Sequence, residues 1–313
     1  MQVVASEFRR RGGKVLEPRQ ATDEEIVRIH DREYLSLIRE TSGRATALDI
    51  DTFTSPDSYE VALLAAGAAV ASVDHVLEGS GLRALAMVRP PGHHAERNRA
   101  MGFCLFNNIA IAAAHARARG LERVAIVDYD VHHGNGTQSA FYDDPSVLFI
   151  SSHQYPYYPG TGAASDTGTG KGAGFTINLP LEVGATDADY DIVYTSIALP
   201  ALRQFRPDLM LVSAGFDALA DDPLGGMRVT AAQFARLTAL LVDVADECCS
   251  GRIAAVTEGG YDLAGFAACL RAATSALAGE TTLEAREATG GAAPRGRATI
   301  DAVLPHLRQA WAL

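Results

Sequence analysis

Short, uninterrupted apolar runs recur along the chain, separated by longer stretches in which apolar residues return every three or four positions. A run of about five or six apolar residues is typical of a strand buried on both faces, as in a parallel sheet. The runs that predict strands are 84–89, 123–128, 146–151, 174–179, 208–213 and 252–257. Strands that alternate with helices predict an α/β fold in three layers, a mainly parallel sheet flanked by helices.

Two of the longer stretches carry a helical pattern. The apolar residues that share one face are Val61, Leu64, Ala68 and Ala71 over 57–78, and Phe234, Leu237, Leu241, Val244 and Cys248 over 230–248. Thr22 with Glu25, and Thr230 with Gln233, have the spacing of capping boxes at helix starts. The polar stretch 283–297 contains Gly and Pro, which predicts a mobile loop before a last short helix.

Composition narrows the class of protein. The 313 residues carry a formal net charge of −11, and basic residues cluster only at Arg9, Arg10 and Arg11, so we expect no nucleic acid as a direct partner. The four cysteines form no C-x-x-C pair, which argues against a zinc ribbon or a disulfide framework. We find neither a signal-peptide pattern nor an apolar run of about 18 residues in the sequence. We therefore expect a cytoplasmic protein without a membrane partner. We expect a single domain over 1–313 and leave a homo-oligomer open.

Chemistry concentrates where four of the predicted strands end. The stretch VDYDVHHGNGT (127–137) follows one apolar run, and its alternation would direct Asp128, Asp130 and His132 to one side. Carboxylates that close to a buried strand are costly unless a cation joins them. The ends of the other three strands carry His93 and His94, Asp217, and Tyr261. In open α/β sheets the ligand site lies beyond the carboxyl ends of the strands, so these groups are expected to meet.

The residue types fit a metal-assisted hydrolysis. Asp130, His132 and Asp217 offer two carboxylates and one imidazole, which balance a divalent cation; three protein ligands with an open position describe a catalytic zinc. Such an ion polarises a carbonyl and lowers the pKa of water to about 7. His93 and His94 are candidates for general base and acid, and Tyr261 for a hydrogen-bond donor to an oxyanion. This combination predicts amide hydrolysis without a covalent intermediate.

The same stretches resemble the histone deacetylase family, which includes acetylpolyamine amidohydrolases. The similarity runs from about residue 20 to 280 and rests on PPGHHA, GFC, DYDVHHGNGTQ, YPGTG, SAGFDA, DPLGG and EGGY. It implies the arginase-deacetylase fold, one catalytic zinc and a nearby potassium ion. The Asn at position 135 resembles the class II-like branch of the family. One departure is that no segment resembling the family's opening HPERP loop, which forms a wall of the pocket mouth, is found.

The resemblance also implies a role for each site residue. Zinc ligands would be Asp130, His132 and Asp217; the acid/base pair would be His93, oriented by Asp128, and His94, paired with neutral Asn135; and Tyr261 would polarise the carbonyl. Potassium would be held by Asp128, Asp130 and main-chain carbonyls near His132 and Ser151. Gly102, Phe103 and Tyr158 would line a channel for an acyl-lysine-like chain, Leu224 would close its rim, and Asp51 would grip the substrate backbone.

Several interpretations remain open from the sequence. The substrate is an acetylated lysine, a polyamine or a small N-acyl amine; apolar Leu224 argues mildly against a polyamine, and the composition looks bacterial. An arginase-like binuclear hydrolase would need further carboxylates in a D-x-H-x-D pattern, and an inactive acyl-lysine binder would not need Tyr261. The Gly-rich run 159–174 lacks a complete Walker pattern, so a structured loop is favoured over a phosphate site.

Other polar and aromatic residues are given structural roles. The histidines expected to be ordinary surface or capping residues are His30, His75, His115 and His306. His133 is expected to support its ligand neighbour, and His153 to be structural. Core filler is one interpretation of the run Tyr155, Tyr157 and Tyr158, and the adjoining PGTG favours the channel for Tyr158. Asp221 and Asp222 are interpreted as part of a solvated loop.

Overall fold

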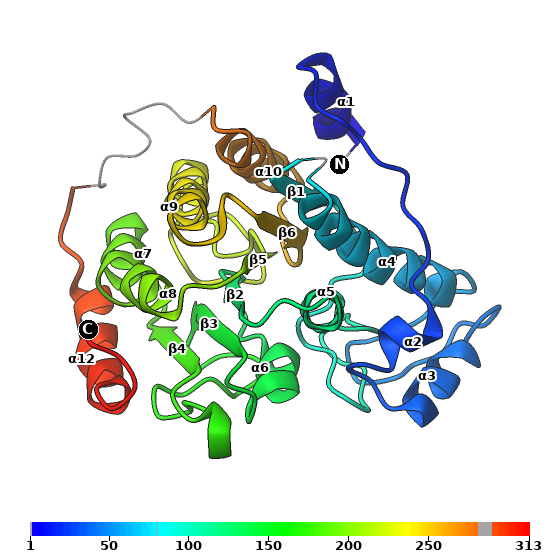
Figure 1. Cartoon of the computed structure of the whole chain (residues 1–313), viewed down its shortest axis with the longest axis horizontal. Coiled ribbons are helices and arrows are strands. Elements are labelled where there is room, and N and C mark those ends of the chain that lie inside the picture. Colours follow the sequence, from blue (N-terminus) through cyan, green and yellow to red (C-terminus); the bar gives the residue numbers. More distant parts are fainter. Residues whose placement is uncertain (1, 80, 281–289) are drawn as a thin grey trace.

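All six predicted strands form one parallel sheet in the computed structural model, which describes residues 2–79, 81–280 and 290–313. The sheet order is β1-β6-β5-β2-β3-β4, and every neighbouring pair is parallel (Figure 1). The strands are β1 (Arg83–Ala86), β2 (Val124–Asp128), β3 (Val147–Gln154), β4 (Thr176–Leu181), β5 (Leu209–Ala214) and β6 (Ile253–Thr257). The expected fold class is therefore confirmed. The first strand is shorter than predicted and the third is longer.

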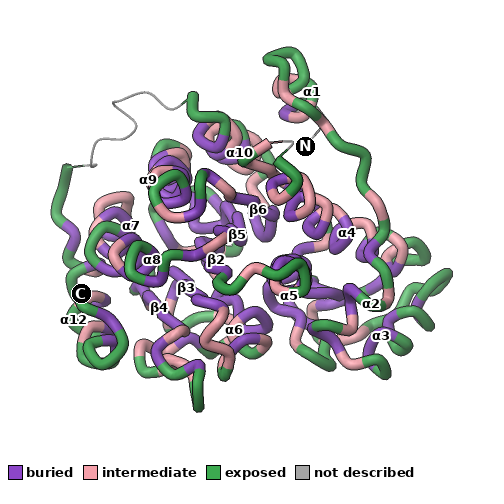
Figure 2. The backbone as a smooth tube through the Cα atoms, viewed as in Figure 1, coloured by how far each residue is buried: buried purple, intermediate pink, exposed green. Residues whose placement is uncertain are grey.

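Helices cover both faces of the sheet. The helices are α1 (Gln2–Arg10), α2 (Asp23–Ile26), α3 (Arg32–Arg39), α4 (Ser58–Leu77), α5 (Asn108–Ala118), α6 (Asn135–Phe141), α7 (Asp187–Val193), α8 (Leu199–Phe205), α9 (Ala231–Cys249), α10 (Leu263–Leu277) and α12 (Pro294–Leu307), with the short elements η1 (Gly170–Gly172) and η2 (Tyr194–Ala198). The sequence alternation explains the layers: Ala125 and Val127 of β2 pack into one apolar cluster, and Val124 and Ile126 into the other. Strands β2, β3, β5 and β6 are buried along their whole length, whereas β1 at the sheet edge is partly exposed (Figure 2).

The long helix α4 departs from its predicted packing. The stripe chosen from the sequence, Val61, Leu64, Ala68 and Ala71, is the less buried side; the core side includes Val70 and Val73. The helix is apolar almost all round, so its sequence does not single out one face. Among the described residues it is the one helix long and apolar enough to cross a membrane, which corrects the expected absence of such a run. Buried core helices meet the same criterion, so this is weak evidence for a span.

One of the local predictions needs correction. Both predicted helix starts are present: the capping box of Thr22 with Glu25 is complete, and at α9 the Gln233 N–H donates to the Thr230 hydroxyl. The loop predicted over 283–297 extends too far, because α12 already begins at Pro294, a favourable first residue for a helix. Residues 281–289 of that stretch lie outside the described chain.

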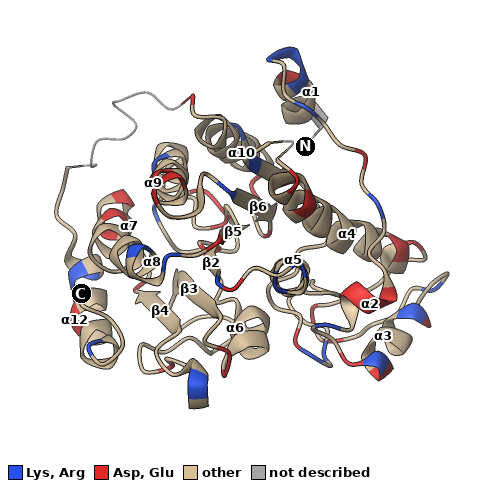
Figure 3. Ribbon diagram, viewed as in Figure 1, with Lys and Arg blue, Asp and Glu red and all other residues tan. Residues whose placement is uncertain are grey.

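Lys and Arg lie on separate outer segments, among them α1, α3 and α12 (Figure 3).

Candidate metal and catalytic site

The four chemistry-bearing loops follow strands that are neighbours in the sheet. His93 and His94 follow β1, Tyr261 follows β6, Asp217 follows β5, and the Asp130 loop follows β2. These strands stand in the order β1-β6-β5-β2, so their carboxyl ends deliver the loops side by side. The sequence predicts that these four segments meet, and the strand order brings them together.

Three side chains form the only cluster of possible metal ligands of this kind among the described residues. One ligand atom from each of Asp130, His132 and Asp217 lies within 4.8 Å of the others. His132 Nδ1 is 3.1 Å from Asp130 Oδ1 and 3.1 Å from Asp217 Oδ2. Short turns aim the carboxylates: the Asp130 N–H donates to Asp128, and the His132 N–H donates to Asp130. The Val131 N–H donates to Asp217 and joins the two loops.

Glycines make room for the carboxylates of this cluster. A Cβ at Gly259 would lie 2.1 Å from Asp217 Oδ2 and 2.7 Å from Asp130 Oδ2, and a Cβ at Gly215 would lie 2.0 Å from Asp130 Oδ2. The Gly259 N–H also donates to Asp130 Oδ2 over 2.8 Å. Two buried carboxylates and one imidazole, converging where backbone leaves space, fit a divalent cation in both charge and donor type.

The electrostatics of the cluster also fit a site that favours positive charge. Burial opposes a charged His132, but the hydrogen bonds and charges of Asp130 and Asp217 outweigh it and raise the pKa of His132 to about 11. Burial and the Asp130 charge raise the pKa of Asp217 to about 7. A positive charge beside these two carboxylates is therefore favourable.

Each of the paired histidines has a different partner behind it. His93 Nδ1 is 2.9 Å from Asp128 Oδ2, and His94 Nδ1 is 2.8 Å from Asn135 Oδ1. Asp128 therefore bonds to His93 rather than joining the metal cluster, because the strand ends at Asp128 and the chain leaves the sheet. Burial lowers the pKa of His94, helped by the charges of His93 and His132. Burial would also lower the pKa of His93, but Asp128 and Asp130 raise it to about 10.

A pocket of about 220 Å³ opens over these groups, and the expected channel residues line it. They are Gly102, Phe103, Tyr158, Leu224 and Asp51. A Cβ at Gly102 would lie 2.3 Å from the His94 ring, so glycine lets the wall approach the histidine. Asp51 Oδ1 accepts the Gly102 N–H over 3.1 Å, which holds this wall in place. Burial and Asp51 raise the pKa of the Tyr158 hydroxyl.

Sequence reasoning missed three lining residues, Pro91, Tyr157 and Gly259. Tyr157, predicted as core filler, is 38% exposed and stacks on His132 with ring centroids 5.6 Å apart. Its position one residue before Tyr158 was a usable signal, because the run YPYYPG places several aromatic residues in one loop. Asp222, predicted to be solvated, is buried, whereas Asp221 is exposed.

The other histidines are more structural than the sequence indicated. His30 is fully buried, with Nδ1 2.9 Å from the Glu96 carbonyl and Nε2 accepting the Asn107 N–H, so its assignment to the surface is wrong. His115 is also buried and contacts Arg28 and Asp74. His75 is partly exposed and His306 is exposed.

Behind the metal cluster, two buried rings pack together. His133 contacts Thr161 and Gln138, and His153 contacts Ser151 and the Gly162 carbonyl. The ring centroids of the two histidines are 4.7 Å apart. Both rings are therefore held by neighbours on the far side of the ligand loop, which agrees with supporting roles.

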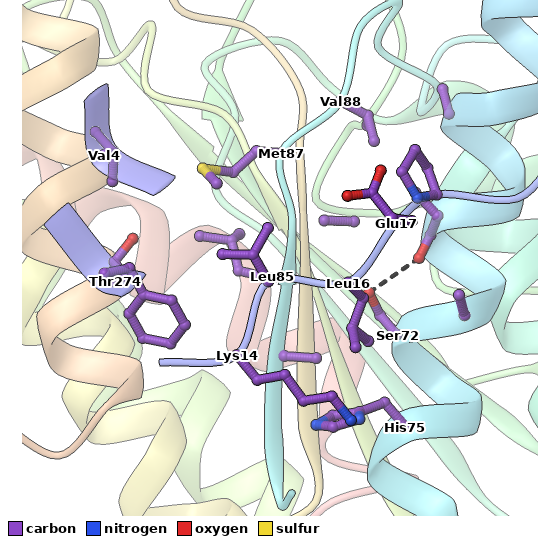
Figure 4. Close-up of a pocket in the computed structure, with 18 of the residues that line it drawn as sticks. Val4, Lys14, Leu16, Glu17, Ser72, His75, Leu85, Met87, Val88 and Thr274 are labelled. Carbon is purple, nitrogen blue, oxygen red and sulfur yellow. Dashed lines mark hydrogen bonds between the residues drawn. The ribbon is translucent and has the colours of Figure 1, made fainter. Parts of the chain in front are cut away.

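A larger hollow, about 570 Å³, lies elsewhere, beside β1, α4 and α10. Figure 4 shows Leu85 of β1, and Met87 just beyond the end of that strand, between Thr274 on one side and Ser72 and His75 on the other. Its lining is mostly aliphatic and contains none of the metal-ligand cluster. Volume alone therefore does not identify the reactive site, whereas converging ionisable groups do.

Comparison with known proteins agrees with the site geometry. A family model described as the histone deacetylase domain matches residues 2–277. A probable deacetylase of Archaeoglobus fulgidus is 42% identical over 251 residues, covering 80% of this chain and 70% of the relative. The human polyamine deacetylase HDAC10 is 44% identical over 283 residues, covering 85% of this chain and 41% of the relative. The crystal structure of the HDA15 HD domain superposes with a TM-score of 0.91 at 37% identity, covering 99% of this chain and 86% of that one.

The fold and the site thus define a hydrolase of the α/β class with a possible metal site of three ligands next to a pair of histidines. The chain belongs to the histone deacetylase family, and it is a deacetylase.

Proposed function

We propose that this protein is a zinc-dependent deacetylase that hydrolyses the amide of N-acetyl-lysine or a similar N-acyl amine. The observation that carries the proposal is the buried cluster of Asp130, His132 and Asp217, whose first two members line a pocket next to two histidines held by Asp128 and Asn135. Zinc is favoured over hard cations such as magnesium because one of the three ligands is an imidazole.

When bound by this cluster, zinc would supply Lewis-acid polarisation of the acyl carbonyl and of a water. The protein's own groups would move the protons. The order expected from the sequence, with His93 as general base and His94 as general acid, is reversed in this proposal. His94 donates from Nδ1 to the Asn135 oxygen, which leaves Nε2 free to accept a proton from the attacking water. His93, held in the charged form by Asp128, donates a proton to the leaving amine. Burial and the charges of Asp217 and Asp130 raise the pKa of Tyr261, so its hydroxyl stays protonated and donates to the developing oxyanion.

The pocket walls favour a slender, apolar substrate arm that ends in an acylated amine. Phe103 and Tyr158 provide aromatic walls, and Leu224 adds an apolar rim that is 36% exposed. An apolar rim offers no charge to a second ammonium group, which supports acyl-lysine over an acetylpolyamine. A polyamine or a small N-acyl metabolite is the second candidate, since one relative is named a polyamine deacetylase.

Further parts of the proposal rest on the resemblance. Potassium would bind near Asp128, Asp130, His132 and Ser151, where the buried Asp128 carboxylate supplies negative charge. A cytoplasmic location, a bacterial source, a homo-oligomer and the absence of nucleic acid or membrane partners remain predictions from the sequence. An arginase-like binuclear site would need a second ligand cluster; the described chain contains one. An inactive acyl-lysine binder would not require the complete set of Tyr261 and two partnered histidines.

The test is release of acetate from N-acetyl-lysine peptides, acetylpolyamines and longer acyl-lysines, with and without a chelator. We expect chelator-sensitive turnover, highest on an acyl-lysine peptide. Tyr261→Phe should lower kcat by about 10²-fold or more, because an oxyanion donor is removed. Tyr142→Phe is the matched control, since Tyr142 lies outside the pocket lining. Chelator-resistant turnover, or an unchanged rate for Tyr261→Phe, would contradict the proposal.

A further inference from the structure

The turn that carries Tyr261 contains two glycines, yet its main chain is held at four points, one of which is the Gly259 carbonyl that accepts the Phe216 N–H over 2.9 Å. The Gly259 N–H donates to Asp130 Oδ2. The next two donors go to one carboxylate oxygen: the Tyr261 N–H is 2.6 Å, and the Asp262 N–H 3.1 Å, from Asp222 Oδ2. Gly260 adopts a φ of +138°, a conformation that residues with a side chain rarely adopt. The sequence suggests a flexible Gly-Gly turn, but the structure gives it a fixed anchor.

Asp222 is itself rigidly placed. It is 5% exposed, and its Oδ1 accepts the Leu224 N–H over 2.9 Å. Its own N–H donates to the Leu219 carbonyl over 3.0 Å, so the residue is part of the loop that follows Asp217. In the chain as described, its carboxylate forms no ion pair with Lys, Arg or His, and it accepts hydrogen bonds from three main-chain N–H groups. Hydrogen bonds to an ionised carboxylate are stronger than neutral ones, which makes this a firm junction.

The Tyr261 side chain has little else to fix it. Its ring meets Phe103 edge-on at 5.9 Å between centroids, and no hydrogen bond of its hydroxyl is found among the described residues. The position of the hydroxyl is therefore set mainly by the backbone of its turn. That backbone is tied through Asp222 to the loop carrying the metal ligand Asp217.

We propose that Asp222 is a positioning residue, which locks the Tyr261 turn onto the loop bearing Asp217. This inference rests on the proposed function for the part that concerns catalysis. Misplacing a reacting group by about 1 Å costs on the order of 10²-fold in rate. Release of the turn would therefore lower kcat through Tyr261, while the metal ligands and the walls that bind substrate stay in place.

The kinetic test is a double-mutant cycle between Asp222 and Tyr261, with Asp221→Ala as the exposed neighbouring control. Asp222→Ala should lower kcat by about 10-fold or more with little change in KM and in metal content. Asp222→Asn should recover part of the rate, because an amide oxygen still accepts N–H groups. In the Tyr261→Phe background the Asp222→Ala change should cost less than about 3-fold, since the hydroxyl it positions is gone. Equal losses in both backgrounds would overturn the proposal.

A second measurement does not depend on turnover. Amide hydrogen exchange should show protected Tyr261 and Asp262 N–H groups in the wild type and faster exchange in Asp222→Ala, which removes the acceptor, but not in Asp221→Ala. Unchanged protection would show that Asp222 does not anchor the turn and would overturn the inference even if the enzyme is an active deacetylase. Lost protection in a protein that deacetylates nothing would uphold the anchor and remove only the proposed function. If Asp222→Ala does not fold, the cycle is run with Asp222→Asn and read in the same way.

Discussion

Substitution of Gly259 by Ala tests the geometry of the metal cluster without removing any ligand. The new Cβ would lie 2.1 Å from Asp217 Oδ2 and 2.7 Å from Asp130 Oδ2, whereas ordinary van der Waals contact begins at 3.4 Å. Asp217 Oδ2 would have to retreat by the difference, 3.4 − 2.1 = 1.3 Å. Metal–ligand distances tolerate only about 0.2 Å, so two of the three ligands leave their positions together. We expect metal affinity to fall by about 10²-fold or more, the upper end of what disturbed ligand support produces.

The assay is metal content after dialysis against a range of free zinc concentrations, combined with acetate release. Gly259→Ala should be metal-poor and inactive at concentrations that saturate the wild type, and excess zinc should restore activity in part. Gly290→Ala is the matched control, because nothing lies within 4 Å of its added Cβ. Wild-type affinity and turnover in Gly259→Ala would refute the claim that the carboxylates beside Gly259 hold the ion.

Three further outcomes follow from the structure. Burial lowers the pKa of His30 from 6.5 to about 4, so between pH 6.5 and pH 4 the unfolded chain binds a proton at this ring and the folded chain does not. The free energy of unfolding is therefore highest above pH 6.5 and falls by about 2 kcal/mol between pH 7 and pH 5. Denaturant titrations of His30→Gln should not show this pH-dependent loss. Leu224→Glu should raise the ratio of kcat/KM for acetylpolyamines over acetyl-lysine peptides, because a rim carboxylate attracts a second ammonium; an unchanged ratio would place the substrate's far end elsewhere. Arg236→Met should destabilise the fold by about 3–5 kcal/mol, since it leaves buried Asp191 without the guanidinium 2.5 Å away. Replacing Asp191 by Leu in the same chain should recover much of that loss, as measured by urea unfolding.

The sheet and the reactive loops could be predicted because their signals are local. Each buried strand is a short apolar run, and each reactive loop begins where such a run ends. Parallel topology then brings the ends together without any knowledge of packing. The same reasoning predicts that Asp130, His132 and Asp217 lie in one cluster, as they do in the structure.

The errors arise where distant segments decide the environment. In the sequence Asp222 resembles its exposed neighbour Asp221. In the structure its carboxylate is covered by the turn after β6, whose Tyr261 and Asp262 N–H groups donate to it. His30 is buried because the loop carrying Glu96 and Asn107 folds over it. The apolar face of α4 could not be chosen from a helix that is apolar nearly all round. In each case the deciding contact is far away in sequence, so periodicity and spacing carry no information about it.

The central claim is that one divalent ion, held by Asp130, His132 and Asp217, makes this protein a deacetylase. Anomalous diffraction at the zinc absorption edge, from crystals of the purified protein, tests it most directly. We expect one strong anomalous peak within coordination distance of all three side chains, and we expect this peak to be lost in crystals of His132→Ala. A peak at any other group of residues, or no peak after soaking in zinc, would contradict it.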